Sequence, residues 1–148
     1  MSACSLPRES DSPAVVIDRS TSDSVADLAT GDDVIQGSPA VSSSAVGRLI
    51  ELAKQHQNVG EWSQAANALE RALRISPRNA TLWLQLSEIR YNEKRYRQAE
   101  SLAQKALQYA GANRTLKRDC WTQIAKSRAA TGDRQGADAA RRQASQFE

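Results

Sequence analysis

Hydrophobic and small residues recur at helical spacing through the C-terminal two thirds of the chain. Leu49, Leu52 and Ala53 follow the spacing i, i+3, i+4, which places them on one face of a helix. Ala65 and Leu69 begin a second stripe of the same kind after a short polar turn. Pairs of such stripes continue to the end of the sequence, so the pattern predicts an all-α fold. The expected helices cover residues 45–58, 61–75, 79–92, 95–109, 114–130 and 133–146.

The pairs of helices repeat along the sequence with a period of 34 residues. Ala65, Ala99 and Ala137 place a small side chain at the same position of each copy, where it lets paired helices approach closely. The third copy begins four residues late, so we expect its first helix to be about one turn longer and to carry the basic residues of 114–118 beyond the stack. The aligned positions are Leu49, Leu52, Ala53, His56, Gly60, Ala65, Leu69, Ala72 and Pro77 in the first copy; Trp83, Leu86, Ser87, Arg90, Lys94, Ala99, Ala103, Ala106 and Gly111 in the second; and Trp121, Ile124, Ala125, Arg128, Gly132, Ala137, Arg141 and Ala144 in the third.

This pattern resembles the tetratricopeptide repeat (TPR), a 34-residue helix–turn–helix unit with small and aromatic residues at fixed positions. The resemblance covers about 100 residues and implies three tandem repeats that stack into a short α-solenoid. The repeats would span about residues 46–79, 80–113 and 118–148. In this family the first helices line a concave face that binds a peptide or a partner's helix. By the family pattern, the partner-binding groove would contain Lys54, Gln57, Asn58, Gln85, Glu88, Tyr91, Asn92, Thr122 and Lys126.

The expected groove mixes polar, charged and apolar side chains. Such a lining favours hydrogen bonds to an extended peptide backbone, with Tyr91 as the main anchor. The alternative is that most of these residues are solvated helix positions without a ligand. Some TPR proteins clamp a terminal carboxylate with a lysine and an asparagine at fixed groove positions. Ile50 and Lys54 stand at those positions here, which disfavours that clamp.

The first 44 residues differ in composition from the rest of the chain. They hold 11 serines and three of the four prolines, and their two basic and seven acidic residues give a net charge of −5. Residues 45–148 hold 18 basic and 10 acidic residues, which give +8, and all three tryptophans. The first segment has too little apolar surface to offset the entropy cost of ordering it. We therefore expect a disordered Ser/Pro/Asp-rich tether at residues 1–44 and a TPR domain at 45–148.

The N-terminal residues Ser2-Ala3-Cys4-Ser5 resemble the end of a bacterial lipobox, in which a small residue precedes a cysteine that becomes lipid-modified. A serine after that cysteine resembles lipoproteins sorted to the outer membrane. The apolar stretch that precedes a lipobox is missing, so either an upstream segment or a chance Ala-Cys pair explains the match. A lipid on Cys4 would be the link to a membrane, because no run approaches the ~20 apolar residues of a membrane helix.

Few residues in the sequence are candidates for chemistry. The one histidine, His56, takes a position that the repeat pattern usually fills with tyrosine, which favours packing over catalysis. Cys120 follows Lys117 and Arg118, so a lowered thiol pKa is one interpretation, and a small buried thiol, which we favour, is the other. The sequence shows no glycine-rich phosphate loop, cysteine pair or nucleophile–base pair. We therefore expect no enzyme activity, no metal or other cofactor and no small-molecule substrate, and the acid-interleaved basic residues disfavour nucleic acid as a partner.

Several further segments carry a more specific resemblance. They are Cys4-Ser5, Ala65-Ala66-Asn67-Ala68-Leu69-Glu70-Arg71-Ala72-Leu73, Ser76-Pro77-Arg78-Asn79, Leu82-Trp83-Leu84-Gln85-Leu86 and Trp121-Thr122-Gln123-Ile124-Ala125. Together with the tether and the repeats, they resemble the LpoP-type activators of class A penicillin-binding proteins, which are outer-membrane TPR lipoproteins. The resemblance implies a periplasm-facing protein that binds a peptidoglycan synthase and favours its active conformation without chemistry of its own. Two other functions stay open: a TPR lipoprotein that assembles a type IV pilus or an outer-membrane machine, and a cytoplasmic TPR adaptor.

Overall fold

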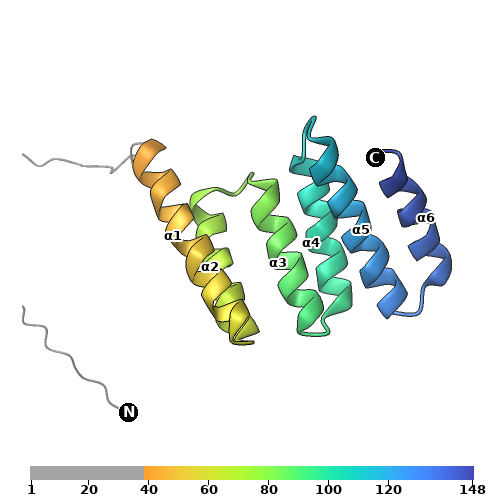
Figure 1. The fold of residues 1–148 in the computed structure, drawn as a ribbon, viewed down its shortest axis with the longest axis horizontal. Helices are drawn as coiled ribbons and strands as arrows, with labels where there is room; N and C mark the ends of the chain where they lie inside the picture. The colour runs from red at the N-terminus through yellow and green to blue at the C-terminus, as the bar shows by residue number, and fades with distance from the viewer. Residues whose placement is uncertain (1–38) are drawn as a thin grey trace, which may run out of the picture. The chain divides into compact units, whose positions relative to one another are not determined.

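The computed structural model describes residues 39–148, with side chains from residue 42 onward. This part of the chain folds into six helices without a strand, which confirms the expected all-α fold. Figure 1 shows the helices following one another in chain order. They are α1 (Pro39–Asn58), α2 (Trp62–Ile75), α3 (Ala80–Asn92), α4 (Tyr96–Tyr109), α5 (Arg114–Ala130) and α6 (Arg134–Ser145).

The helices pack in pairs, and the pairs stack. Within each repeat the first helix packs along the second: α1 with α2, α3 with α4, and α5 with α6. Neighbouring repeats meet through α2 against α3 and α4 against α5, and the first helices α3 and α5 also touch. This is the serial arrangement of three helix pairs that an α-solenoid requires, as the repeat pattern predicted.

Side-chain caps fix where the helices of the later repeats begin. Before α3, Oδ1 of Asn79 accepts hydrogen bonds from the backbone N–H groups of Thr81 and Leu82, at 3.1 and 3.3 Å. Before α5, Oδ1 of Asn113 accepts one from Leu116 at 3.0 Å. These bonds satisfy amide donors that the first turn of a helix leaves without a partner. The asparagines therefore define these helix starts within one residue of the expected positions.

Helix α5 has the length that the sequence pattern predicts, whereas α1 is longer. Helix α5 has 17 residues and α3 has 13, so the four extra residues of the third repeat do lengthen its first helix by about a turn. Helix α1 instead begins at Pro39, earlier than the expected start at residue 45. Proline suits the first turn of a helix because its missing N–H would have no acceptor there. The serines of 42–44 resemble tether composition, but they belong to this helix.

Small side chains lie where the paired helices cross. Ala65, Ala99 and Ala137 are all fully buried. The hydroxyl of Ser87 donates a hydrogen bond to the carbonyl oxygen of Ala99 at 2.6 Å, so the backbones of α3 and α4 lie very close. A larger side chain at these positions would force the helices apart.

The three tryptophans pack against the core. Trp62 and Trp83 lie partly buried on the apolar cluster of the first two repeats. Trp121 packs on the cluster of the third repeat. The indole N–H of Trp83 also donates to the carbonyl oxygen of Pro77 at 2.8 Å, which ties α3 to the turn before it.

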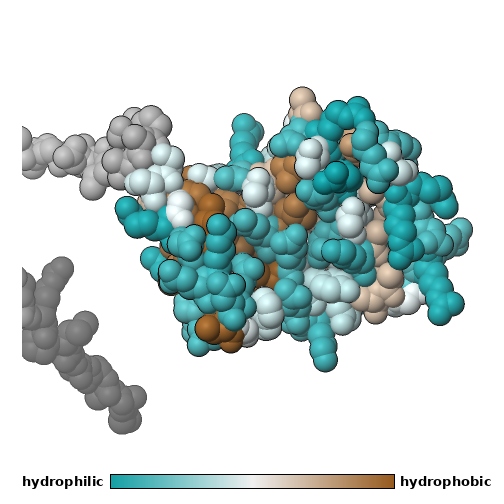
Figure 2. Space-filling model, viewed as in Figure 1, coloured by the Kyte–Doolittle hydropathy of each residue, from teal (hydrophilic) through white to brown (hydrophobic). Residues whose placement is uncertain are grey.

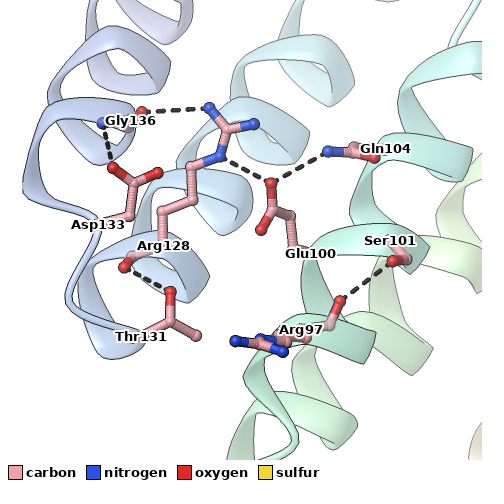
Figure 3. Close-up of polar contacts among 8 residues, drawn as sticks. All are labelled: Arg97, Glu100, Ser101, Gln104, Arg128, Thr131, Asp133 and Gly136. Carbon is pink, nitrogen blue, oxygen red and sulfur yellow. Dashed lines mark hydrogen bonds and ion pairs between the residues drawn. The ribbon is translucent and has the colours of Figure 1, made fainter.

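Ionisable side chains occupy the position where the repeat pattern usually has a tyrosine. In the first repeat this residue is His56, which hydrogen-bonds within its own repeat. In the second repeat, Nη2 of Arg90 lies 2.6 Å from Oε1 of Glu70 on α2. In the third, Nε of Arg128 lies 2.7 Å from Oε1 of Glu100 on α4. Each arginine thus links its own repeat to the second helix of the preceding one, and Figure 3 shows the second of these links.

One face of the domain is mostly hydrophilic. Figure 2 shows this face, on which the most strongly hydrophobic residues lie over the first helices of the series and only paler ones lie toward the last pair. Leu52 is 36% exposed, whereas Leu86 and Ile124, at the same position of the later repeats, are 4% and 0% exposed. The difference arises because no described helix pair precedes α1. None of the described helices combines the length and the hydropathy that a membrane-spanning helix needs.

Candidate peptide-binding groove

The first helices of the three repeats line an open hollow of about 270 Å³. We call it the central hollow. It brings together five of the nine expected groove residues, contributed by α1, α3 and α5, and adds one residue that was not among the nine. The lining residues are Gln57, Glu88, Tyr91, Asn92, Gln123 and Lys126.

A second hollow, of about 530 Å³, lies between α5 and α6. We call it the α5–α6 hollow. One more expected groove residue, Thr122, lines it, and Lys126 lines both hollows, so the two adjoin along α5. The other lining residues are Arg118, Ala125, Arg141, Ala144, Ser145 and Glu148.

Three expected groove residues lie outside both hollows. Lys54 is exposed and pairs with Glu51, one turn earlier on α1, at 3.7 Å. Asn58 is exposed at the end of α1. Gln85 is half-buried on α3, and its Oε1 is buried without a hydrogen-bond partner. Most of the expected groove residues that line a hollow therefore belong to the second and third repeats.

The basic residues at the start of α5 do not extend beyond the stack, which corrects the expectation for residues 114–118. Nη2 of Arg114 donates to the carbonyl oxygen of Gln146 at 3.2 Å, and Lys117 Nζ lies 5.8 Å from the ring centroid of Phe147. Arg118 lines the α5–α6 hollow. The physical reason is that the extra turn of α5 lies beside the returning C-terminal segment, which Arg114 and Lys117 contact.

The sequence pattern also missed the contribution of α6 to the groove. Arg141 takes a position where the repeat pattern has an aromatic core residue, and this substitution was the available signal that α6 turns a polar side chain outward. Gln123 stands at the same repeat position as Gln85, so the two amides recur from one repeat to the next. Nε2 of Gln123 is buried without a hydrogen-bond partner in the described structure.

The charges of the central hollow perturb one carboxyl group. Burial raises the pKa of Glu88 above its ordinary value; the nearby Lys126 acts in the opposite direction, and Asp119 adds to the rise. Part of the Glu88 side chain remains open to solvent. The carboxylate of Glu88 and the ammonium group of Lys126 therefore both line the central hollow. Among the described residues, the two groups form no direct ion pair with each other.

Cys120 is a structural residue. It is fully buried against Leu84 and Ala106. Burial, with further contributions from Asp119 and Glu88, raises the pKa of the thiol to about 11, although a backbone hydrogen bond acts the other way. The interpretation of a lowered pKa beside Lys117 and Arg118 is therefore wrong, and that of a small buried thiol is confirmed.

The proposed lipidation site, Cys4, and residues 1–38 of the segment expected to form a tether lie outside the described residues, whereas residues 39–44 belong to α1. The expected boundary between residues 44 and 45 and the roles of the groove residues stay predictions.

Comparison with known proteins agrees with this architecture. A family model of the tetratricopeptide repeat matches residues 59–118. The solved structure of the globular C-terminal domain of Pseudomonas aeruginosa LpoP aligns with 36% identity and a TM-score of 0.67, covering 68% of this chain and 95% of that one. The N-terminal domain of stress-induced protein-1 (STI-1) from Caenorhabditis elegans aligns with a TM-score of 0.67 over 72% of this chain and 86% of that one; at 14% identity it shows the fold alone. No curated protein sequence matches the chain. The chain belongs to the tetratricopeptide repeat family, and its helical domain is a relative of the globular C-terminal domain of LpoP.

Proposed function

We propose that this protein binds a class A penicillin-binding protein through the groove along α1, α3 and α5 and raises its peptidoglycan synthase activity. The observation that carries the proposal is the 36% identity to the LpoP domain across 95% of that domain's length. A TPR domain is a protein-interaction scaffold, so the partner's own active site performs the chemistry.

The geometry of the groove supports a protein ligand rather than a small molecule. Both hollows are open and lined by a mixture of amide, hydroxyl and charged groups, and they adjoin along α5 at Lys126. An extended segment of a partner fits an elongated surface of this kind because its backbone offers donors and acceptors at regular intervals. Activation then follows if the scaffold binds the active conformation of the synthase more tightly than the inactive one.

Site-specific crosslinking in cells tests which surface binds which partner. A photo-crosslinking amino acid replaces Tyr91 in the central hollow or Thr122 in the α5–α6 hollow. The matched control replaces Gln108, an exposed residue on α4. We expect a class A penicillin-binding protein to be captured at 91 and 122 and not at 108.

A second measurement tests the activity. The purified full chain is added to the captured synthase, and the rate of glycan polymerisation is followed with and without it. An increased rate supports activation. Capture of a pilus secretin or an outer-membrane assembly factor at 91 and 122, with no synthase, contradicts the proposal and favours an envelope-assembly scaffold.

We also propose that Cys4 is lipidated and anchors the protein to the outer membrane, facing the periplasm. The resemblance of Ser2-Ala3-Cys4-Ser5 to a lipobox and the relationship to LpoP support this. Each buried methylene of an acyl chain contributes about 0.8 kcal/mol to membrane affinity, so several chains anchor a protein stably. Metabolic labelling with an alkyne fatty acid should mark the wild-type protein and the Ser2→Thr control but not Cys4→Ala. An unlabelled wild-type protein in the cytosolic fraction would favour a cytoplasmic adaptor instead.

A further inference from the structure

The α5–α6 hollow is richer in hydrogen-bond donors than the rest of the groove. Three cationic side chains line it, Arg118 and Lys126 from α5 and Arg141 from α6. Glu148 contributes the one acidic side chain of the lining. The hollow therefore offers more positive than negative groups to a ligand, and its size of about 530 Å³ admits a side chain together with the adjoining backbone.

The three cations differ in how far the protein already neutralises them. Arg118 donates to Oδ1 of Asp119 from Nε and Nη2, at 3.1 and 2.9 Å, and Arg141 pairs with Asp138. Lys126 forms no ion pair with any described residue. A guanidinium carries five N–H donors, so both arginines retain donors for a second acceptor. The unpaired ammonium of Lys126 makes an anionic ligand the best complement to the hollow.

An independent observation comes from Gln123 at the floor of the groove. The residue is 4% exposed and lines the central hollow, and its Nε2 has no hydrogen-bond partner. A buried donor that lacks a partner is costly, so native structures rarely leave one without a ligand, water or protein acceptor. A backbone carbonyl of a bound segment would supply that acceptor.

Glu88 determines on which side of Lys126 an acidic group of a ligand is favoured. Its carboxyl lines the central hollow on the α3 side, so a second carboxylate there would be repelled. The α6 side of Lys126 lacks Glu88 and carries two further cations, Arg141 and Arg118, against the single carboxylate of Glu148. A ligand's acidic side chain is therefore favoured on the α6 side of Lys126, and neutral backbone is favoured beside Glu88.

We infer that the groove binds an extended peptide segment whose acidic side chain lies among Arg118, Lys126 and Arg141, while a backbone carbonyl of the same segment accepts a hydrogen bond from Nε2 of Gln123. This inference rests on the proposed function, because it names the chemistry of the partner segment that the groove recognises. It differs from the terminal-carboxylate clamp of other TPR proteins, since those positions hold Ile50 and Lys54 and lie in the first repeat.

A positional-scanning library of octapeptides tests the inference on the full-length chain carrying Cys4→Ser. We expect enrichment of Asp and Glu at one position of the peptide. Replacing that residue by Asn or Gln in a fluorescein-labelled peptide should weaken binding about tenfold, which corresponds to the loss of one close charge pair.

Variants of the chain locate the effect. Lys126→Glu combined with Arg141→Glu should invert the preference, so that Lys and Arg are enriched at the same peptide position. The control Arg142→Gln changes a neighbouring exposed cation outside both hollows and should leave the preference unchanged. An inverted preference cannot arise from unfolding, and circular dichroism checks that each variant is helical.

The outcomes separate this inference from the proposed function. Selection of peptides without an acidic preference, or a preference that persists in the double variant, overturns the inference and leaves synthase binding at residues 91 and 122 standing. Failure to select any peptide while the intact synthase still crosslinks to the groove also overturns it, since recognition would then need a folded surface. Absence of both peptide selection and synthase capture overturns the inference and the proposed function together.

Discussion

Nε of Arg128 donates a hydrogen bond to Oε1 of Glu100 at 2.7 Å and thereby joins the third repeat to the second helix of the second repeat. Both side chains are more than two thirds buried, at 28% and 22% exposed. Nη1 of the same arginine donates to the carbonyl oxygen of Gly136 at 3.4 Å, so the guanidinium also touches α6. Arg128 on α5 thus occupies the position where the repeat pattern usually has a tyrosine, and its side chain contacts both α4 and α6.

Removal of this ion pair should destabilise the domain. Glu100→Gln leaves the guanidinium without its anionic partner, and hydrogen bonds to charged groups contribute about 1.5–3 kcal/mol. We expect the free energy of unfolding, measured with urea, to fall by roughly that amount. The control Asp138→Asn breaks the exposed pair with Arg141 and should cost no more than about 0.5 kcal/mol. Equal effects of the two substitutions would show that the Arg128–Glu100 pair is no stronger than a surface pair.

Gly136 is required by the cap at the start of α6. Oδ1 of Asp133 accepts a hydrogen bond from the backbone N–H of Gly136 at 2.8 Å. A Cβ at residue 136 would lie 2.0 Å from Oδ2 of that carboxylate and 3.0 Å from Cδ of Arg128. Gly136→Ala must therefore displace the Asp133 carboxylate: losing this cap costs about 1–2 kcal/mol, the higher helix propensity of alanine offsets about 0.5–1 kcal/mol, and we expect a net loss of about 0.5–1 kcal/mol.

A second glycine provides the matched control for that substitution. Gly47 lies inside α1, and a Cβ built there meets nothing within 4 Å. Gly47→Ala should stabilise the protein by about 0.5–1 kcal/mol, because alanine restricts the unfolded chain and favours the helix. Opposite shifts of the melting temperature for the two Gly→Ala substitutions would support the assignment. A stabilised Gly136→Ala variant would contradict it.

Local signals in the sequence predicted most of the fold. The apolar period placed every helix boundary within one residue, apart from the start of α1. That start was missed because Pro39 and the serines after it resemble a tether, and helix formation there depends on the rest of α1 rather than on composition. Five groove residues converge because their positions follow from helix register alone.

The rest of the candidate site depends on contacts between elements that no local pattern encodes. Arg118 and Arg141 share a hollow only because α5 and α6 pack against each other. The burial of Cys120 likewise follows from packing against Leu84 and Ala106 on two other helices, which outweighs the two basic neighbours in the sequence.

Cys120 should be almost unreactive in the native protein. With a thiol pKa of about 11, roughly one molecule in a thousand carries the thiolate at pH 8, and the sulfur is also fully buried. In the Cys4→Ser variant, reaction with a disulfide reagent should therefore proceed only as fast as the domain opens, and urea should accelerate it to the rate of a free cysteine. Fast modification without denaturant would contradict the packing of α5 against α3 and α4.

The raised pKa of Glu88 predicts how stability depends on pH. Burial is the main cause of the rise from the ordinary value of 4.5, so the folded state holds this proton to a higher pH than the unfolded state does. Below both pKa values the group is protonated in both states and has no effect. Between the pKa of the unfolded state and the raised pKa of the folded state, the unfolded chain has released its proton while the folded state still holds it. Stability therefore falls as pH rises through this range, and the loss is complete once pH exceeds the raised pKa.

Glu88→Gln removes this loss of stability and should raise the melting temperature at pH 7 but not at pH 3.5. The control Glu51→Gln, on the exposed side of α1, should change the melting temperature little at either pH. A Glu88→Gln variant that is less stable than the wild type at pH 7 would mean that the attraction of Lys126 outweighs burial.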